Sequence, residues 1–432
     1  MRQATIRNRR IGVWKTLLPL AFLVVVAIAP ARGDHWPRFR GPNGTGVSDL
    51  QGLPTAWTES DYEWVVELPG SGHSSPVIWD EALFLTTALD DGARTLHRYN
   101  ALTGKEEWSQ MTRLGVPPTH KKSSLASSTP ALDGERVYVA FADEHQQLLI
   151  AYTFDGDQVW SYDLGPYKSM HGIGVSPIVY GDLVVMSNEQ AGESSIVALH
   201  RLTGKVAWSH PRPAKEVSYA TPIVLELDGR APQLIVLGEP GGLESLNPLT
   251  GESIWQTAAM PQRTVASPVY GGGVVIASSG QGGMGKYLRA VDPTGSGDVT
   301  STHVRFERPE KDTLNYVPTP VVLGEYVYLW CDRGIVCCVE LSSGRTIWSE
   351  RIGGNYSSSP IAVDGRLYGV SEEGEVVVLA AAPEFRELGR SPLGDGSHAT
   401  PAVANGRLYV RGFGRLVSLR AKSLVEAAGS GN

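Results

Sequence analysis

The stretch HGIGVSPIVYGDLVVMSNEQAGESSIVALHRLTGKVAW (His171–Trp208) contains all the elements of one structural repeat. A small residue and Pro177 precede a short apolar run, and a second run, LVVMS (Leu183–Ser187), follows. The segment LTGKVAW (Leu202–Trp208) then combines a TG turn with a final tryptophan. Short β-rich runs separated by glycine-containing turns are typical of antiparallel strands. We therefore interpret each such unit as four strands, named A to D, with the proline before strand A and the tryptophan in strand D.

The proline signal recurs eight times along the chain. Each copy has a small residue, a proline and then an apolar residue, and neighbouring copies are 40 to 54 residues apart. The eight prolines are Pro76, Pro130, Pro177, Pro222, Pro268, Pro320, Pro360 and Pro401. Four strands in about 45 residues form one blade of a β-propeller. The sequence therefore predicts an all-β protein, an eight-bladed β-propeller of four-stranded blades.

A second series of residues marks the ends of the D strands. Its members are Trp64, Trp108, Trp160, Trp208, Trp255, Phe306, Trp348 and Leu388. The two series are offset by one, because Trp64 precedes the first proline signal and no equivalent residue follows Pro401. We therefore expect the strand near Trp64–Leu68 to be the outer strand of the last blade, whose other strands come from about Ala399–Leu419. The N-terminal strand would then close the ring, with the tryptophans packed between blades rather than binding a ligand.

The repeat resembles the quinoprotein-type (PQQ-like) repeat family over about Trp57–Arg420, through the proline signals and hairpins such as LTGKEEW (Leu102–Trp108). More narrowly, WPRFRGPNGTGVS (Trp36–Ser48) and GGNYSSSPIAVDGRLYGVSEEGE (Gly353–Glu375) are similar to exported repeat proteins of planctomycete-type bacteria. The resemblance implies an eight-bladed ring. One relative in fold, the propeller lipoprotein of the outer-membrane assembly machine, has no catalytic role. The family also includes quinone-dependent alcohol dehydrogenases, so the resemblance does not decide the function.

The N-terminal residues have the features of an export signal. Basic residues precede a 13-residue apolar run, Leu17–Ala29, which is shorter than a membrane span, and Ala31-Arg32-Gly33 fits a cleavage site. We expect a signal peptide at 1–33, an N-terminal arm at 34–56 packed on the ring, the propeller at 57–421 and a polar tail at 422–432. The protein would be exported, periplasmic or secreted, with no transmembrane span in the mature chain. General secretion is favoured over the twin-arginine route, and an uncleaved signal that anchors the chain is the minor alternative.

The net charge limits the classes of partner. Residues 34–432 contain 32 Lys and Arg against 45 Asp and Glu, a formal charge of −13. A strongly acidic surface disfavours nucleic acid and anionic lipid as partners.

Two functions from different classes fit the sequence. The first is a non-catalytic exported module that binds or scaffolds a protein, peptide or glycan in the cell envelope, with no catalytic residue, no metal and no cofactor. The alternative is a PQQ-dependent alcohol or sugar dehydrogenase, which would need Ca²⁺ held by clustered carboxylate and amide oxygens. We cannot assemble that set from these near-minimal blades. Cys337 and Cys338 lie in a predicted strand, where neighbouring side chains point to opposite faces, so we expect buried free thiols rather than the vicinal disulfide found in some dehydrogenases of the family.

The candidate ligand site follows from propeller topology. The D–A and B–C loops open on one face, and five residues in the D–A loops are predicted to surround the channel mouth. They are His73, His171, Tyr219, Tyr356 and His398. His73 and His398 each lie three residues before the signal proline in adjacent blades, so we expect them to be close to each other. The alternatives are that these residues only pin the loops by hydrogen bonds or, less favoured, that they bind a metal.

Charged residues in the B–C loops are also expected on this face. They are Asp90, Asp91, Asp143, Glu144, Glu189, Glu193, Glu239, Asp332, Glu372 and Glu373. We expect this acidic rim to attract cationic partners, with an attraction that weakens as salt rises.

Overall fold

The computed structural model describes residue 1 and residues 35–169, 171–239, 241–281 and 286–422. It divides into a first unit, Met1–Arg32, and a second unit, Gly33–Asn432. Apart from Met1, every described residue belongs to the second unit. Apart from Met1, the predicted signal peptide lies outside the described residues, and so does all but the first residue of the predicted tail.

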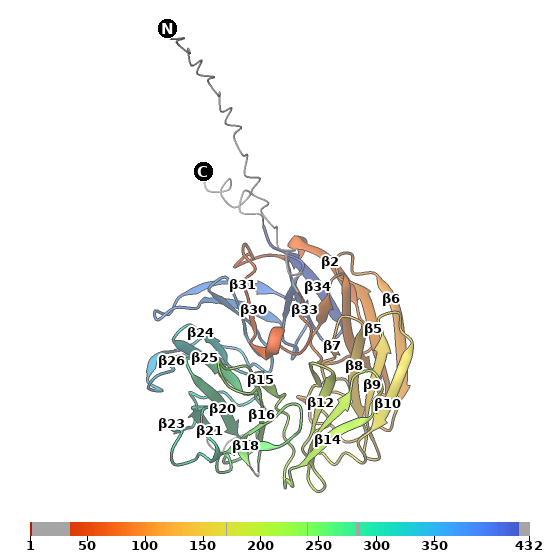
Figure 1. The fold of residues 1–432 in the computed structure, drawn as a ribbon. Coiled ribbons are helices and arrows are strands. Elements are labelled where there is room, and N and C mark those ends of the chain that lie inside the picture. The colour runs from red at the N-terminus through yellow and green to blue at the C-terminus, as the bar shows by residue number, and fades with distance from the viewer. Residues whose placement is uncertain (2–34, 170, 240, 282–285, 423–432) are drawn as a thin grey trace. The chain divides into compact units, whose positions relative to one another are not determined.

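The described residues form eight sheets arranged in a ring, each a blade of four antiparallel strands (Figure 1). We number the blades in the order of the proline signals. The innermost A strands are β3 (Val77–Trp79), β7 (Ala131–Leu132), β11 (Ile178–Tyr180), β15 (Ile223–Leu225), β19 (Val269–Gly271), β24 (Val321–Leu323), β28 (Ile361–Val363) and β32 (Ala402–Ala404). The B strands are β4 (Ala82–Ala88), β8 (Arg136–Ala142), β12 (Leu183–Asn188), β16 (Gln233–Gly238), β20 (Val274–Gly280), β25 (Tyr326–Trp330), β29 (Arg366–Val370) and β33 (Arg407–Arg411).

The outer half of each blade is also regular. The C strands are β5 (Ala93–Asn100), β9 (Gln147–Thr153), β13 (Ser195–His200), β17 (Gly242–Leu246), β21 (Lys286–Val291), β26 (Ile335–Glu340), β30 (Glu375–Ala380) and β34 (Arg415–Arg420). The D strands are β6 (Glu106–Arg113), β10 (Gln158–Asp163), β14 (Val206–Pro211), β18 (Ser253–Gln256), β23 (Val304–Glu310), β27 (Thr346–Arg351), β31 (Glu387–Pro392) and, from the N-terminal part of the chain, β2 (Tyr62–Glu67). The short strands β1 (Val47–Ser48) and β22 (Gly297–Asp298) add to the edges of blades 7 and 4, and two 3₁₀ turns, η1 (Pro42–Gly44) and η2 (Glu59–Asp61), lie before β2. Eight blades of four strands are what the repeat count predicted.

The ring is closed by the N-terminal strand, as the offset of the two series predicted. Strand β2 pairs antiparallel with β34, and Trp64 lies opposite Ser418. The sheet order is β2-β34-β33-β32, so the two ends of the described propeller share one blade (Figure 1).

The D-strand tryptophans pack between blades. Trp208 is 8% exposed, and its Nε1 donates to the Pro248 carbonyl of blade 4 at 3.1 Å. Its ring lies on Gly251, whose φ is +74° and where an added Cβ would come within 2.6 Å of the ring. This explains the TG turn, because only glycine combines that backbone conformation with so close an approach. The same ring-on-glycine contact joins Trp64 to Gly104, Trp108 to Gly156, Trp160 to Gly204 and Phe306 to Gly344.

The residues directly before the eight prolines form a closed ring of hydrogen bonds around the channel. In each blade the backbone N–H of this Ser or Thr donates to the hydroxyl of its counterpart in the next blade, over 2.9–3.2 Å. The ring runs through Ser75, Thr129, Ser176, Thr221, Ser267, Thr319, Ser359 and Thr400 and returns to Ser75. Proline restricts the preceding residue to extended backbone, which holds the eight residues in one repeated geometry. We call this set the hydroxyl ring.

The N-terminal arm fills the channel on one side of the hydroxyl ring. Trp36 is buried and exchanges two backbone hydrogen bonds with Ile78 of blade 1. The Arg40 guanidinium is buried and donates to the carbonyls of Thr319 and Pro320, each over 2.7 Å, and burial lowers its pKa to about 9. Strand β1 then pairs parallel with β28 of blade 7. The arm therefore contacts the A strands of blades 1 and 7 and the segment that leads into the A strand of blade 6.

The cysteines are buried free thiols, as predicted. Cys337 packs with Leu329 in the core between blades 5 and 6, whereas Cys338 packs with Tyr328 in the core between blades 6 and 7. The two neighbouring side chains therefore point to opposite faces of β26.

Candidate functional site

A cavity of about 890 Å³ occupies the mouth of the channel on the face of the D–A and B–C loops. The whole hydroxyl ring lines it, and Phe39 of the N-terminal arm lies among the lining residues. Because the arm fills the channel next to the ring, the cavity is a cup with Phe39 and the hydroxyl ring at its base. A volume of this size suits a drug-sized ligand or a few residues of a peptide.

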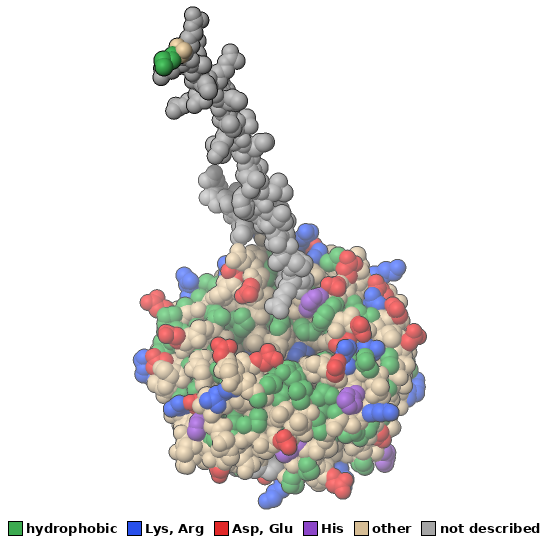
Figure 2. All heavy atoms as spheres, in the orientation of Figure 1, with side chains coloured by type: hydrophobic (Ala, Val, Ile, Leu, Met, Phe, Trp, Pro, Cys, Tyr) green, Lys and Arg blue, Asp and Glu red, His purple; other side chains and the backbone are tan. Residues whose placement is uncertain are grey.

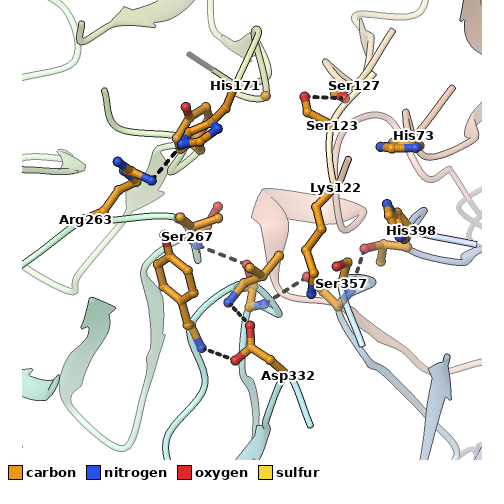
Figure 3. Close-up of a pocket in the computed structure, with 18 of the residues that line it drawn as sticks. His73, Lys122, Ser123, Ser127, His171, Arg263, Ser267, Asp332, Ser357 and His398 are labelled. Carbon is orange, nitrogen blue, oxygen red and sulfur yellow. Dashed lines mark hydrogen bonds between the residues drawn. The ribbon is translucent and has the colours of Figure 1, made fainter. Parts of the chain in front are cut away.

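Four of the five predicted site residues line this cup, namely His73, His171, Tyr219 and His398. The rings of His73 and His398 meet edge to face, with their centroids 4.5 Å apart (Figure 3). This proximity across the closing blade is the one predicted from their shared position three residues before proline. Whether these residues bind a ligand stays a prediction.

Tyr356 does not lie at the mouth, so this part of the site prediction is wrong. It is fully buried, is not among the residues that line the cup, and packs edge-on against Trp330 at 5.4 Å. Its backbone N–H donates to the Asp332 carbonyl of blade 6 at 2.9 Å, which turns the side chain into the core between blades 6 and 7. Burial raises the pKa of its phenol. Position before the proline therefore does not by itself decide whether a side chain faces the channel.

One wall of the cup is built around His171. Its Nε2 lies 2.9 Å from Nη1 of Arg263 (Figure 3). Since a guanidinium can only donate, this Nε2 accepts, and the imidazole is neutral with its proton on Nδ1. Burial lowers the pKa of His171, and the nearby charges of Arg263 and His120 lower it further. Tyr219 lies beside His171, with its hydroxyl 3.2 Å from Ser169 Oγ.

The opposite wall joins the histidine pair to an ion pair. Lys122 Nζ lies 2.7 Å from Glu372, which also accepts a hydrogen bond from Ser357 at 2.7 Å. Burial lowers the pKa of His73 to about 3, and the charges of His398 and Arg411 contribute to this. Burial also lowers the pKa of His398, although Glu372 opposes that shift. Both imidazoles are therefore neutral at pH 7.

The lining of the cup is cationic, whereas the acidic rim was predicted for the B–C loop tips around it, of which Asp90, Asp91, Glu144, Glu193 and Glu373 are exposed. Six basic side chains line the cup, namely Lys122, Arg263, Lys286, Lys311, Arg333 and Arg351, against Asp312 and Asp332. Several predicted rim carboxylates are instead used inside the fold. Glu189 is buried and pairs with Arg212 at 2.6 Å, and Asp143 accepts backbone N–H groups of its own loop. On the face of the molecule drawn in Figure 2, charges of both signs are interspersed.

Sequence reasoning missed most of these cationic residues. Arg263 lies in a D–A loop, five residues before Pro268, in the same window as the chosen histidines and tyrosines. The charge of that residue was the available signal, but the prediction favoured imidazoles and phenols. Lys311 lies at the start of the D–A loop between blades 5 and 6, and Arg333 lies in the B–C loop of blade 6. No repeat position marks either residue.

Comparison with known proteins agrees with this architecture. The family model described as outer membrane protein assembly factor BamB matches residues 47–145, 119–350 and 286–383, which together span most of the chain. This chain belongs to the BamB family. BamB of Yersinia pestis is 25% identical to it over 301 residues, which are 65% of this chain and 70% of that protein. BamB of Francisella salina is 24% identical over 197 residues, 44% of this chain and 33% of that protein.

Solved structures show that the fold is shared more widely. BamB from Moraxella catarrhalis superposes with a TM-score of 0.57 at 15% identity, covering 83% of this chain and 98% of that one. Quinohemoprotein alcohol dehydrogenase from Comamonas testosteroni superposes with a TM-score of 0.64 at 14% identity, covering 90% and 81%. At these identities the likeness concerns the fold alone.

The cup of this BamB-family propeller does not fit the calcium-quinone pair of the dehydrogenases. Within the described residues no group of three or more His, Cys, Asp or Glu side chains is placed to hold a metal ion. The Asp332 carboxylate already pairs with Lys286 at 3.0 Å and accepts the backbone N–H groups of Tyr316 and Val317. The Asp332 carboxylate oxygens are therefore surrounded by an ammonium group and N–H donors, whereas a Ca²⁺ site would need further oxygen ligands beside them.

Proposed function

We propose that this protein is a non-catalytic binding module of the bacterial cell envelope, which holds a protein partner on the face that contains the cup. Membership in the BamB family over residues 47–383 carries this proposal, because the family is described as an outer membrane protein assembly factor. The protein would be exported to the periplasm, and its cup would work without a quinone cofactor. No membrane-spanning helix is found in the part of the chain that the structure describes.

The architecture suits binding more than chemistry. The neutral pair His73 and His398 presents flat rings and hydrogen-bonding nitrogens at the mouth, and Nδ1 of each is buried without a protein partner among the described residues. Such groups favour a ligand that supplies complementary polar atoms, because a buried polar group left unpaired costs free energy. The ring of blades positions both histidines in the lining of the cup.

The test is cross-linking of the purified protein in an envelope extract, followed by identification of the protein that is captured. Wild type is compared with a His73→Ala/His398→Ala double variant, and melting of both is followed in parallel. We expect one envelope protein to be captured by wild type and lost from the double variant at an unchanged melting temperature. Capture that survives the double substitution, or capture of a glycan alone, would contradict the proposal.

A second assay addresses the enzymatic alternative. Purified protein is mixed with PQQ and Ca²⁺, and dye reduction with alcohols and aldose sugars is recorded. We expect no saturable absorbance change and no dye reduction. A positive result in both measurements would replace the binding module with a dehydrogenase.

A further inference from the structure

The base of the cup is a ring of unused hydrogen-bond donors. Every hydroxyl of the hydroxyl ring accepts one backbone N–H, and no protein acceptor receives its own hydrogen among the described residues. A hydroxyl has one donor hydrogen and two acceptor lone pairs, so each can still donate. Since all eight residues line the cavity, the base offers a circle of O–H donors to whatever enters it.

The walls of the cup add unpaired positive charge. Lys122, Arg263 and Lys286 each lie near a carboxylate, at 2.7 Å from Glu372, 3.5 Å from Glu216 and 3.0 Å from Asp332. The other three basic residues, Lys311, Arg333 and Arg351, are exposed and have no ion pair within the described part of the chain. Asp312 is the one lining carboxylate without such a pair there. Even with Glu216 and Glu372 included, the cup retains an excess of positive charge in a chain that is acidic as a whole.

We propose that the cup receives an acidic segment of the partner protein, with side-chain or terminal carboxylates directed at the hydroxyl ring and at Lys311, Arg333 and Arg351. This rests on the proposed function, because it names the chemistry of that partner. Carboxylates are acceptors without donors, which complements a surface of O–H and N–H donors. A long polyanion such as nucleic acid fits less well, since the exterior of the propeller is acidic and would repel it.

The test measures binding of three labelled peptides to the full protein by fluorescence anisotropy: hexaglutamate, hexaglutamine and hexalysine. We expect hexaglutamate to bind, to weaken as salt rises from about 0.02 M to about 0.3 M, and to exceed the other two. Lys311→Gln/Arg333→Gln should weaken hexaglutamate about tenfold, because it removes two ion-pair partners. The matched control is Lys105→Gln/Arg345→Gln, two exposed basic residues in C–D turns on the opposite face, which should leave binding unchanged. All variants should melt like wild type.

Three results would overturn the acidic-segment proposal. They are preferential binding of hexalysine or hexaglutamine, an equal loss of hexaglutamate binding in both double variants, and binding of free citrate where hexaglutamate does not bind. The cross-linking assay separates this proposal from the proposed function. A partner captured equally by wild type and Lys311→Gln/Arg333→Gln would keep the binding module and overturn the acidic segment. Selective hexaglutamate binding without any captured envelope protein would support the acidic chemistry of the cup and contradict the proposed function.

Discussion

The backbone N–H of Thr400 donates to Ser75 Oγ at 3.2 Å, although 325 positions separate the two residues in the chain. This bond links blade 8 to blade 1 at the axis, while the pairing of β2 with β34 links the same two ends of the chain at the rim. The ring is thus closed twice. A hydrogen bond from backbone to side chain closes it at the axis, and the pairing of two strands closes it at the rim.

Removing one member of the hydroxyl ring should destabilise the fold. Ser75→Ala leaves the buried Thr400 N–H without an acceptor, so we expect a loss of about 1–3 kcal/mol in the free energy of unfolding. Urea denaturation measures it. Ser128→Ala is the matched control, because the buried Ser128 hydroxyl has no hydrogen-bond partner among the described residues, and its loss should be near zero. Equal losses in the two variants would show that the ring bond adds no stability.

The packing between blades predicts a large effect at strand D. Trp208→Ala removes the ring that lies on Gly251 and should cost about 3–5 kcal/mol, measured by urea denaturation. Leu202→Ala, in the exposed part of the same hairpin, should cost less than about 0.5 kcal/mol. A loss below about 1 kcal/mol for Trp208→Ala would mean that the tryptophan does not hold blades 3 and 4 together.

The histidine pair predicts sensitivity to acid. Burial lowers the pKa of His73 to about 3, against an ordinary 6.5. Between these values the unfolded chain binds the proton and the folded protein does not, so stability falls as the pH drops below 6.5, by at most about 1.4 kcal/mol per pH unit. His73→Gln should therefore flatten the stability profile between pH 6.5 and pH 4, whereas His200→Gln at an exposed site should not. Identical profiles for wild type and His73→Gln would refute the shift.

The thiols should be unreactive in the native protein. All three cysteines are buried, which keeps the reagent away from their sulfur atoms. Burial raises the pKa of the Cys338 thiol to about 11, whereas the hydrogen bond with Cys331 lowers the pKa of the Cys337 thiol, so the protection of Cys337 rests on its burial. We expect Ellman's reagent to titrate none of them in native protein and all three in guanidinium chloride. Titration of only one thiol after denaturation would show that two of the three form a disulfide.

For much of the candidate site, the sequence predicted the face of the propeller but not which side chains line the cup. The repeat placed the D–A loops on one face, and two residues three positions before proline, His73 and His398, met as expected. The same reasoning failed for Tyr356, because the bond from its N–H to the Asp332 carbonyl turns the ring into the core. It did not predict the cationic lining of the cup, because the pairing of a loop carboxylate with a cation, as in Glu189 with Arg212, depends on which loops meet in the folded protein.

The sequence by itself determined the number of blades, the closure by the N-terminal strand and the role of the tryptophans. These features rest on local strand and turn patterns repeated eight times, and each repeat packs on its neighbours in the same way. Only the tertiary structure decided the hydroxyl ring, the filling of the channel by Arg40 and its neighbours, and the cationic cup. Those features depend on side chains from all around the ring that meet at one axis. The free energy gained by pairing a polar group there, or lost by leaving it unpaired, is set by its partners in space rather than by its neighbours in the chain.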